Sequence, residues 1–390
     1  MYFTDGSLFP ENMAPLVITA APYGPSWLPG DAADIAVTWD EQVQAAVDCY
    51  NAGATMLHLH VRNPATGHMS ADIDHFNHML DRLKKAVPKM IIQVGGSISF
   101  APKGEGKKSE WLSYDTRHML AELKPTPEVV TVAVGTCMMD LTQMWSADDI
   151  KGTHLEDPKK LAAWAGMFTD AGPAFYLEHL KRLKKNGIQP HFPLANVHQL
   201  EIVERLIRHG VYMGPLNIAI TCYGGGGCGY NPFDWMEFIR RTPQGATATM
   251  WAGMRTNAVA QPLGIILGQH CRVGNEDNLW NAKRQRITTV QQVQAVVKLA
   301  EQFGRKVATA EDARQIMKIG VTYNSAEETL QNLGLPPNRK EGERGFMVWP
   351  TDGKRGVAPA MSDSHPMAYC MVPPDQPETR EPVGAAAKGR

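Results

Sequence analysis

One stretch of the chain decides its fold, Met56-Leu57-His58-Leu59-His60-Val61-Arg62. Alternate side chains of a β-strand point to opposite faces, so His58, His60 and Arg62 share one face while the aliphatic residues share the other. The aliphatic face suits a covering layer of helices, which leaves the imidazoles and the guanidinium pointing inward. The stretch therefore predicts a strand that is buried on both faces, as in a parallel sheet.

Seven other short apolar runs occur along the chain, and longer amphipathic segments separate them. Eight alternations of strand and helix predict a parallel sheet, and eight strands are enough to close a (β/α)8 TIM barrel. An open, doubly wound sheet is the alternative. The predicted strands are Leu16–Ala21, Thr55–Val61, Met90–Val94, Val129–Val134, Gln189–Leu194, Asn217–Thr221, Ala246–Ala252 and His270–Gly274.

Helix signals lie between these strands. Thr38 and Glu41 form a predicted capping box, and Ala71–Ala86 carries apolar residues on one helical stripe. We expect the barrel to be a catalytic domain spanning residues 1–334. Residues 335–390 are rich in proline and glycine but contain an apolar cluster at 346–349, so we expect a C-terminal extension that is partly extended or disordered.

Composition excludes several classes of protein. Lys+Arg number 39 and Asp+Glu number 40 in 390 residues, which leaves no basic excess for nucleic acid. No apolar run approaches the roughly 18 residues needed to cross a membrane. The start of the chain lacks the pattern of a secretory signal, and the six scattered cysteines form no CxxC pair. A cytoplasmic protein is expected.

The histidine pair is a candidate metal site. Two imidazoles on one face of a buried strand are costly without a metal, although hydrogen-bonded core histidines are the alternative. Glu276 offers a third ligand, because it follows the last strand, which lies about 10 Å from the second strand in a closed barrel. Asp277 comes next and can act as a base paired with Arg272. The alternative for Glu276 and Asp277 is the solvated start of a loop.

Other strand ends carry weaker signals. Glycines in Gly95-Gly96-Ser97 free backbone N–H groups that can receive a carboxylate, although a plain tight turn fits as well. Thr131 can donate a hydrogen bond to a bound oxygen. The glycine-rich stretch 223–229 matches neither phosphate-binding pattern, so a loop at the barrel mouth is expected there.

These motifs together resemble the β-keto acid cleavage enzyme family, of which the 3-keto-5-aminohexanoate cleavage enzyme is the first characterised type. The resemblance runs from about Leu16 to Gly334. It rests on Ala52-Gly53-Ala54 before the histidine strand, on Pro127-Glu128 before Thr131 with Gly135-Thr136-Cys137 after it, and most specifically on residues 272–278, Arg-Val-Gly-Asn-Glu-Asp-Asn.

The resemblance implies a zinc-dependent (β/α)8 enzyme that assembles as a homo-oligomer, a tetramer or a dimer. It implies that a β-keto acid and acetyl-CoA exchange acyl groups to give acetoacetate and a new acyl-CoA. One Zn²⁺ per chain would be held by His58, His60 and Glu276, with Asp277 as the base and Arg272 as its partner. The expected substrate contacts are Thr131, Gly95, Gly96, Ser97, Ser26 and Arg62.

One position departs from the family pattern. The family's amine-recognising glutamate would follow the first strand, where this chain has Ser26. A serine cannot hold an ammonium group as a carboxylate does, so we expect the acyl end of the substrate to be neutral or anionic. Arg62 and the basic loop Lys103–Lys108 would favour an anion.

Two other functions compete with this prediction. A metal-dependent hydrolase of the amidohydrolase type also uses a His-x-His strand, but normally on the first strand, with further histidines on strands five and six. The predicted sixth strand has no histidine. A barrel with a purely structural zinc would usually supply four protein ligands, and the sequence offers three.

Overall fold

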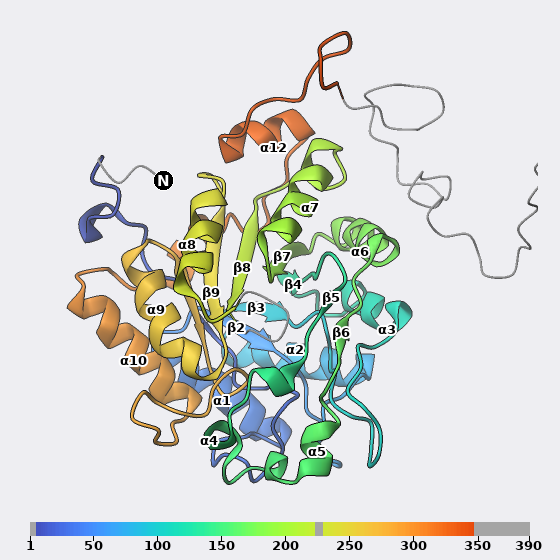
Figure 1. Cartoon of the computed structure of the whole chain (residues 1–390), viewed down its shortest axis with the longest axis vertical. Helices are drawn as coiled ribbons and strands as arrows, with labels where there is room; N and C mark the ends of the chain where they lie inside the picture. Colours follow the sequence, from blue (N-terminus) through green and yellow to red (C-terminus); the bar gives the residue numbers. More distant parts are fainter. Residues whose placement is uncertain (1–4, 223–228, 347–390) are drawn as a thin grey trace, which may run out of the picture. The chain divides into compact units, whose positions relative to one another are not determined.

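A computed structural model describes residues 5–222 and 229–346 of the chain. Eight parallel strands form a closed barrel in the order β1-β10-β9-β8-β7-β4-β3-β2, which confirms the predicted fold class. Figure 1 shows the strands at the centre, with helices around them. The barrel strands are β1 (Ile18–Ala20), β2 (Met56–Leu59), β3 (Ile91–Val94), β4 (Val129–Thr131), β7 (Gln189–Leu194), β8 (Asn217–Cys222), β9 (Thr247–Ala252) and β10 (His270–Val273).

The helices begin at side-chain caps that the sequence supplies. At the first of them, Thr38 Oγ1 accepts from Glu41 N while the Glu41 carboxylate accepts from Thr38 N, which is the predicted capping box. The helices that follow barrel strands are α1 (Trp39–Asn51), α2 (Ile73–Ala86), α3 (Tyr114–His118), α6 (Pro173–Lys185), α7 (Val197–Arg208), α8 (Pro232–Arg241), α9 (Asn257–Ile266) and α10 (Thr289–Gln302).

Strand β2 has the alternation that its sequence predicts. Leu57 and Leu59 pack in the layer between the strands and the helices. Met56 packs inside the barrel with Ile91 and Val129, and His58 is buried on that same inner side. The inner face of β2 thus delivers imidazole groups to the carboxyl end of the barrel.

A short helix, α11 (Ala310–Ile316), closes the amino end of the barrel. Ala313 and Met317 pack against Met56 and the other inner residues of the first strands. The Met317 carbonyl accepts hydrogen bonds from the side-chain amides of Gln189 and Asn217. The last described helix of the barrel unit, α12 (Ala326–Leu333), packs beside α7.

An insertion between β4 and β7 is the main element that the sequence analysis missed. It contains an antiparallel pair, β5 (Cys137–Met138) and β6 (Phe168–Thr169), and two short helices, α4 (Ala147–Ile150) and α5 (Pro158–Ala162). Figure 1 shows α4 and α5 at the opposite end of the barrel from α12. Apolar residues of the insertion, including Trp145 and Trp164, form a second core with Trp27 and Phe100 from the mouth loops.

By its internal contacts the chain divides into two compact units, Met1–Asn338 and Arg339–Arg390. The predicted boundary at residue 334 and the form of the 335–390 extension stay predictions, because residues 347–390 lie outside the described part. The predicted mouth loop at 223–229 also lies almost wholly outside it. Within the described ranges, no helix is long and apolar enough to cross a membrane.

Candidate active site

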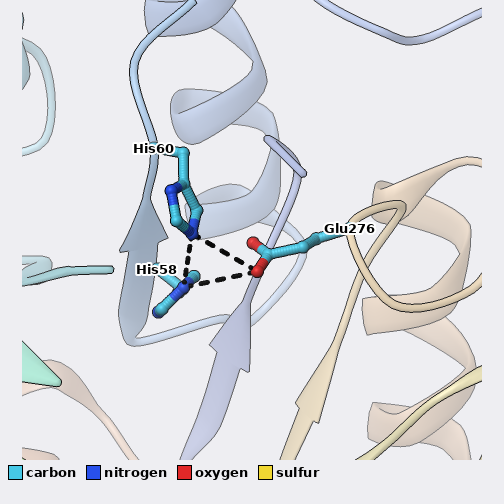
Figure 2. Close-up of side chains that lie close together, drawn as sticks. All are labelled: His58, His60 and Glu276. Carbon is cyan, nitrogen blue, oxygen red and sulfur yellow. Dashed lines mark hydrogen bonds and ion pairs between the residues drawn. The ribbon is translucent and has the colours of Figure 1, made fainter. Parts of the chain in front are cut away.

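Three predicted metal ligands converge at the carboxyl end of the barrel. Nε2 of His58 lies 3.2 Å from Nε2 of His60, and Glu276 Oε1 lies 3.5 and 3.4 Å from these two nitrogens. Figure 2 shows the ring of His58, on the strand, and that of His60, just past its end, turned toward the carboxylate of Glu276, which comes from the segment after another strand. Strand β1 separates β2 from β10, as the closed barrel predicted.

The hydrogen-bond partner of Nδ1 in each imidazole shows which ring nitrogen faces the space between the three side chains. Nδ1 of His60 lies 2.7 Å from the Ile98 carbonyl oxygen, which can only accept. Nδ1 of His58 lies 2.6 Å from Oε1 of Gln93. In its neutral form, each ring would therefore carry its hydrogen on Nδ1 and present a lone pair on Nε2.

Two converging lone pairs beside a carboxylate repel one another unless a cation lies between them. Burial, and after it the Arg272 guanidinium, lowers the pKa of His58 to about 4, so that ring is neutral at neutral pH. Oε2 of Glu276 is buried and has no hydrogen-bond partner among the described residues. Two imidazoles and one carboxylate are the donor set of several catalytic zinc sites, so these residues fit a divalent metal ion.

Arg272 connects the carboxylates of Glu276 and Asp277. Its Nε and Nη2 donate to Asp277 Oδ2 and Oδ1 at 2.7 and 2.8 Å, and Nη2 also lies 2.7 Å from Glu276 Oε1. Burial alone would raise the pKa of Glu276, but Arg272 and the imidazoles outweigh it and hold this pKa well below its usual range. The Glu276 carboxylate is therefore ionised.

Trp251 on β9 completes this cluster. Its indole Nε1 donates to Asp277 Oδ1 at 3.0 Å, and the Arg272 guanidinium lies 3.4 Å from the centre of its ring. The bidentate contact and the indole hydrogen bond fix the orientation of the Asp277 carboxylate.

Gly95 and Gly96 allow two close approaches at the end of β3. A Cβ on Gly95 would lie 2.4 Å from the ring of His60, and a Cβ on Gly96 would lie 1.9 Å from the Thr131 carbonyl oxygen. Gly96 N donates to Thr131 Oγ1 at 2.6 Å. Ile98, two residues on, has φ +61°, which is strained for a β-branched residue and aims its carbonyl at His60.

A cavity of about 140 Å³ opens beside these groups. Nine of the residues predicted for the site line it: Ser26, His58, His60, Gly95, Gly96, Ser97, Thr131, Glu276 and Asp277. Arg272 lies behind the two carboxylates, in contact with both.

Arg62 is not among the lining residues, which corrects the prediction that it contacts substrate. Strand β2 ends at Leu59, so strand alternation no longer governs where Arg62 points. The guanidinium donates instead to the carbonyl oxygens of Gly67, Gly24 and Trp27. Arg62 thereby holds the loop after β1, which places Ser26 at the cavity.

The sequence analysis did not identify several residues that support or line the site. Gln93 supports His58, and its signal was a single amide within the apolar run Ile91–Val94. Trp251 similarly occupies a run that was interpreted only as a strand. Met138, Met144 and Trp145 of the insertion also line the cavity.

Comparison with known proteins agrees with this geometry. A family model described as beta-keto acid cleavage enzyme matches residues 15–319. The chain belongs to the beta-keto acid cleavage enzyme family. This membership confirms the resemblance that the strand motifs indicated, and it places the chain in a family of enzymes.

Two relatives show how broad the beta-keto acid cleavage enzyme family is. The chain is 28% identical over 310 residues to a 3-keto-5-aminohexanoate cleavage enzyme of Acetoanaerobium sticklandii, covering 79% of this chain and 99% of the relative. It is 25% identical over 314 residues to a 3-dehydrocarnitine:acetyl-CoA trimethylamine transferase of Rhizobium meliloti, covering 77% and 96%.

A solved structure shares the barrel of the beta-keto acid cleavage enzymes. The binary complex of ObcA with oxaloacetate superposes with a TM-score of 0.53 at 15% identity, over 74% of this chain and 68% of that one. At this identity the likeness shows the fold alone.

Proposed function

We propose that the chain is a zinc-dependent β-keto acid cleavage enzyme that uses acetyl-CoA as co-substrate. The reaction is R–CO–CH2–COO⁻ + CH3–CO–SCoA → R–CO–SCoA + CH3–CO–CH2–COO⁻. One observation supports the proposal most strongly in a member of this family. His58, His60 and Glu276 lie at the same cavity as the carboxylate of Asp277, which Arg272 holds in place.

His58, His60 and Glu276 would hold one Zn²⁺ per chain. When bound, the ion supplies Lewis-acid polarisation of the keto acid's oxygens and balances the negative charge of the reacting carbon framework. Three protein ligands leave a coordination position for substrate, which distinguishes this set from a structural site with four.

Asp277 is the proposed base. It lines the cavity one residue past a ligand, and its carboxylate is held by Arg272 and Trp251. Asp277 takes a proton from C2 of the keto acid, and C2 attacks the thioester carbon of acetyl-CoA as the CoA thiolate leaves. The thiolate then attacks C3, the C2–C3 bond breaks, and C2 of the departing acetoacetate recovers the proton.

Thr131 and the Gly95-Gly96-Ser97 turn are the proposed contacts for substrate oxygens. Thr131 Oγ1 already accepts from Gly96 N, so its own hydrogen can be donated to a bound oxygen. Both groups lie beside the histidines in the cavity. They would hold the keto acid with C2 toward Asp277, which is positioning of the kind that raises rates most.

The competing functions lose their support. The amidohydrolase type would bring a strand-five histidine to the metal, but Nδ1 of His191 on β7 faces the Gln93 amide, and His191 is outside the three-ligand group found in the described chain. A non-catalytic barrel does not agree with membership of an enzyme family.

Homo-oligomerisation remains part of the proposal, and sedimentation of the purified chain tests it.

The test is to incubate zinc-loaded protein with acetyl-CoA and a panel of β-keto acids. Mass spectrometry should detect acetoacetate and one new acyl-CoA in equal amounts. Zinc-free protein is the control and should be inactive until zinc is restored. Absence of acetoacetate with every β-keto acid would overturn the proposal.

A further inference from the structure

We propose that this enzyme selects β-keto acids whose acyl end is bulky, uncharged and apolar. The inference rests on the proposed function and deepens it by naming the substrate class. It narrows the sequence-based expectation of a neutral or anionic end, because the structure shows which side chains line the cavity.

The cavity has two chemically different parts. The reacting groups stand on β2, on the turn after β3, and on the segment after β10, as described above. The rest of the lining is dominated by aromatic and sulfur-containing or aliphatic side chains of the insertion and the mouth loops. These are Trp27, Phe100, Trp111, Met138, Met139, Leu141, Met144, Trp145 and Met254.

Basic residues are missing from this lining within the described ranges. Arg62 is committed to backbone carbonyls, and Lys103, Lys107 and Lys108 are exposed residues that do not line the cavity. A second carboxylate on the substrate would therefore be desolvated without a cationic partner and would enter a cavity that the carboxylate of Asp140 also lines. That arrangement disfavours dicarboxylic keto acids.

A cationic end would meet one carboxylate in this part of the described lining, Asp140. Its Oδ1 already accepts from the backbone N–H and the hydroxyl of Thr142 at 3.0 and 2.6 Å, so an ammonium group would have to compete with these donors for the negative charge. The aromatic rings of the lining also pack against other rings instead of standing alone around an open space. Phe100 stacks on Trp111 at 6.4 Å between ring centres, and Trp145 has Trp27 and Trp164 each at 5.7 Å.

The size of the cavity limits the acyl end. Its volume of about 140 Å³ includes the part beside the reacting groups, so the apolar part alone is smaller than the engineered cavity of about 150 Å³ that binds benzene. Methionine side chains adapt their shape to irregular apolar ligands, so the lining can make room for a larger group. A branched aliphatic acyl end, or a phenyl end if the methionines shift, is the expected type of substrate.

The experiment measures kcat/KM for four β-keto acids of matched length that end in a methyl, a phenyl, a carboxylate or a trimethylammonium group. We expect the methyl and phenyl compounds to exceed both charged ones by about a hundredfold. Each methylene added to the aliphatic compound should raise kcat/KM roughly three- to fourfold until the cavity is full. A preference for either charged compound overturns the inference while leaving the proposed function intact.

A matched pair of variants locates the preference. Met138 lines the cavity, and its strand partner Phe168 does not, although both are exposed residues of the β5–β6 pair. We expect Met138→Arg to shift the preference at least tenfold toward the carboxylate compound and Phe168→Arg to leave it unchanged. Equal shifts in both variants, or none in Met138→Arg, would place the acyl end elsewhere.

Binding without turnover separates the two proposals. Quenching of tryptophan fluorescence by the same four acids, without acetyl-CoA, reports on a cavity lined by four tryptophans. Tighter binding of the phenyl compound with no exchange in any assay would remove the proposed reaction and keep the apolar site. Tighter binding of a charged compound would remove the apolar site.

Discussion

Gln93 Oε1 accepts a hydrogen bond from Nδ1 of His58 over 2.6 Å, and the other end of the same amide contacts His191 on β7. One buried amide thereby fixes the orientation of a ligand ring from outside the ligand group. Supporting contacts of this kind set both the tautomer and the basicity of a ligating histidine.

The first prediction follows from that contact. Gln93→Leu should weaken zinc affinity by about 10- to 100-fold while leaving all three ligands in place. Competition with a chromophoric chelator measures this affinity. Gln44→Leu, on the exposed face of α1, is the matched control and should bind zinc like the wild type. Unchanged affinity in Gln93→Leu would remove the supporting role.

A second prediction concerns the ligands themselves. His58→Ala and Glu276→Gln should each lose most of the one equivalent of zinc, because two protein ligands hold the ion poorly. Metal analysis after gel filtration measures the content. His198→Ala, an exposed histidine on α7, should keep its full equivalent. If both ligand variants also keep one tightly bound equivalent, the ion binds somewhere else.

The third prediction separates catalysis from metal binding. Asp277→Asn should retain zinc and lose turnover by at least a thousandfold, since an amide cannot take the C2 proton. Trp251→Phe removes the 3.0 Å indole hydrogen bond to Asp277, keeps an aromatic ring beside Arg272, and should cost about tenfold in kcat. Exchange of solvent deuterium into C2 of the keto acid reports on the proton step directly. Near wild-type exchange in Asp277→Asn would assign the base to another group.

A fourth prediction tests the close approach at the end of β3. Gly95→Ala should displace the His60 ring, because the added Cβ would lie 2.4 Å from it. We expect loss of zinc and a fall of about 1–3 kcal/mol in the free energy of unfolding. Gly172→Ala is the control, since its Cβ would meet nothing nearer than 3.6 Å. Normal zinc content in Gly95→Ala would show that the ring has room to move.

Asp31 supplies a fifth prediction, on stability. Its carboxylate accepts from Leu28 N, His154 N and His154 Nδ1 at 2.6–2.7 Å and so ties the loop after β1 to the insertion. Burial raises the pKa of Asp31, but the hydrogen bonds from His154 and Leu28 outweigh it and lower the pKa. Asp31→Asn should cost about 1–3 kcal/mol at neutral pH.

The pH dependence of that cost has a definite sign. A lowered folded-state pKa gives stability that is complete above the usual value of about 4 and is lost as the pH falls through the folded-state pKa. Denaturant unfolding of both proteins should therefore show their difference shrinking only in acid. A difference that grows as the pH falls would contradict the assignment.

The sequence predicted the barrel because strands buried on both faces leave mostly uninterrupted apolar runs. The run of β7 contains Pro190 and Pro193, and this segment nevertheless pairs with both neighbouring strands. The sequence also predicted that His58, His60 and Glu276 come together, because strand alternation still holds at His60, one residue past the end of β2. The same rule failed for Arg62, which lies three residues past Leu59. Alternation has no force once the chain leaves the sheet.

The sequence did not reveal elements that are too short to show a hydrophobic repeat. The insertion consists of two-residue strands and single helical turns, which leave no repeat of 2 or 3.6 residues in the sequence. Its tryptophans and methionines were nevertheless a usable signal, since a loop exposed to water rarely contains so many apolar residues. Gln93 was a similar signal, a lone polar side chain in a buried strand.

The closure of the amino end of the barrel by α11 has a consequence for how substrates enter and products leave. Met56, Ile91 and Val129 pack against Ala313 and Met317 beneath the reacting groups and fill the amino end of the barrel with side chains. In the proposed reaction we therefore expect keto acid, acetyl-CoA and both products to share the mouth at the opposite end. Acetoacetate that has not diffused away is itself a β-keto acid at the same mouth, so it competes with each incoming molecule and sets the net direction of exchange by mass action.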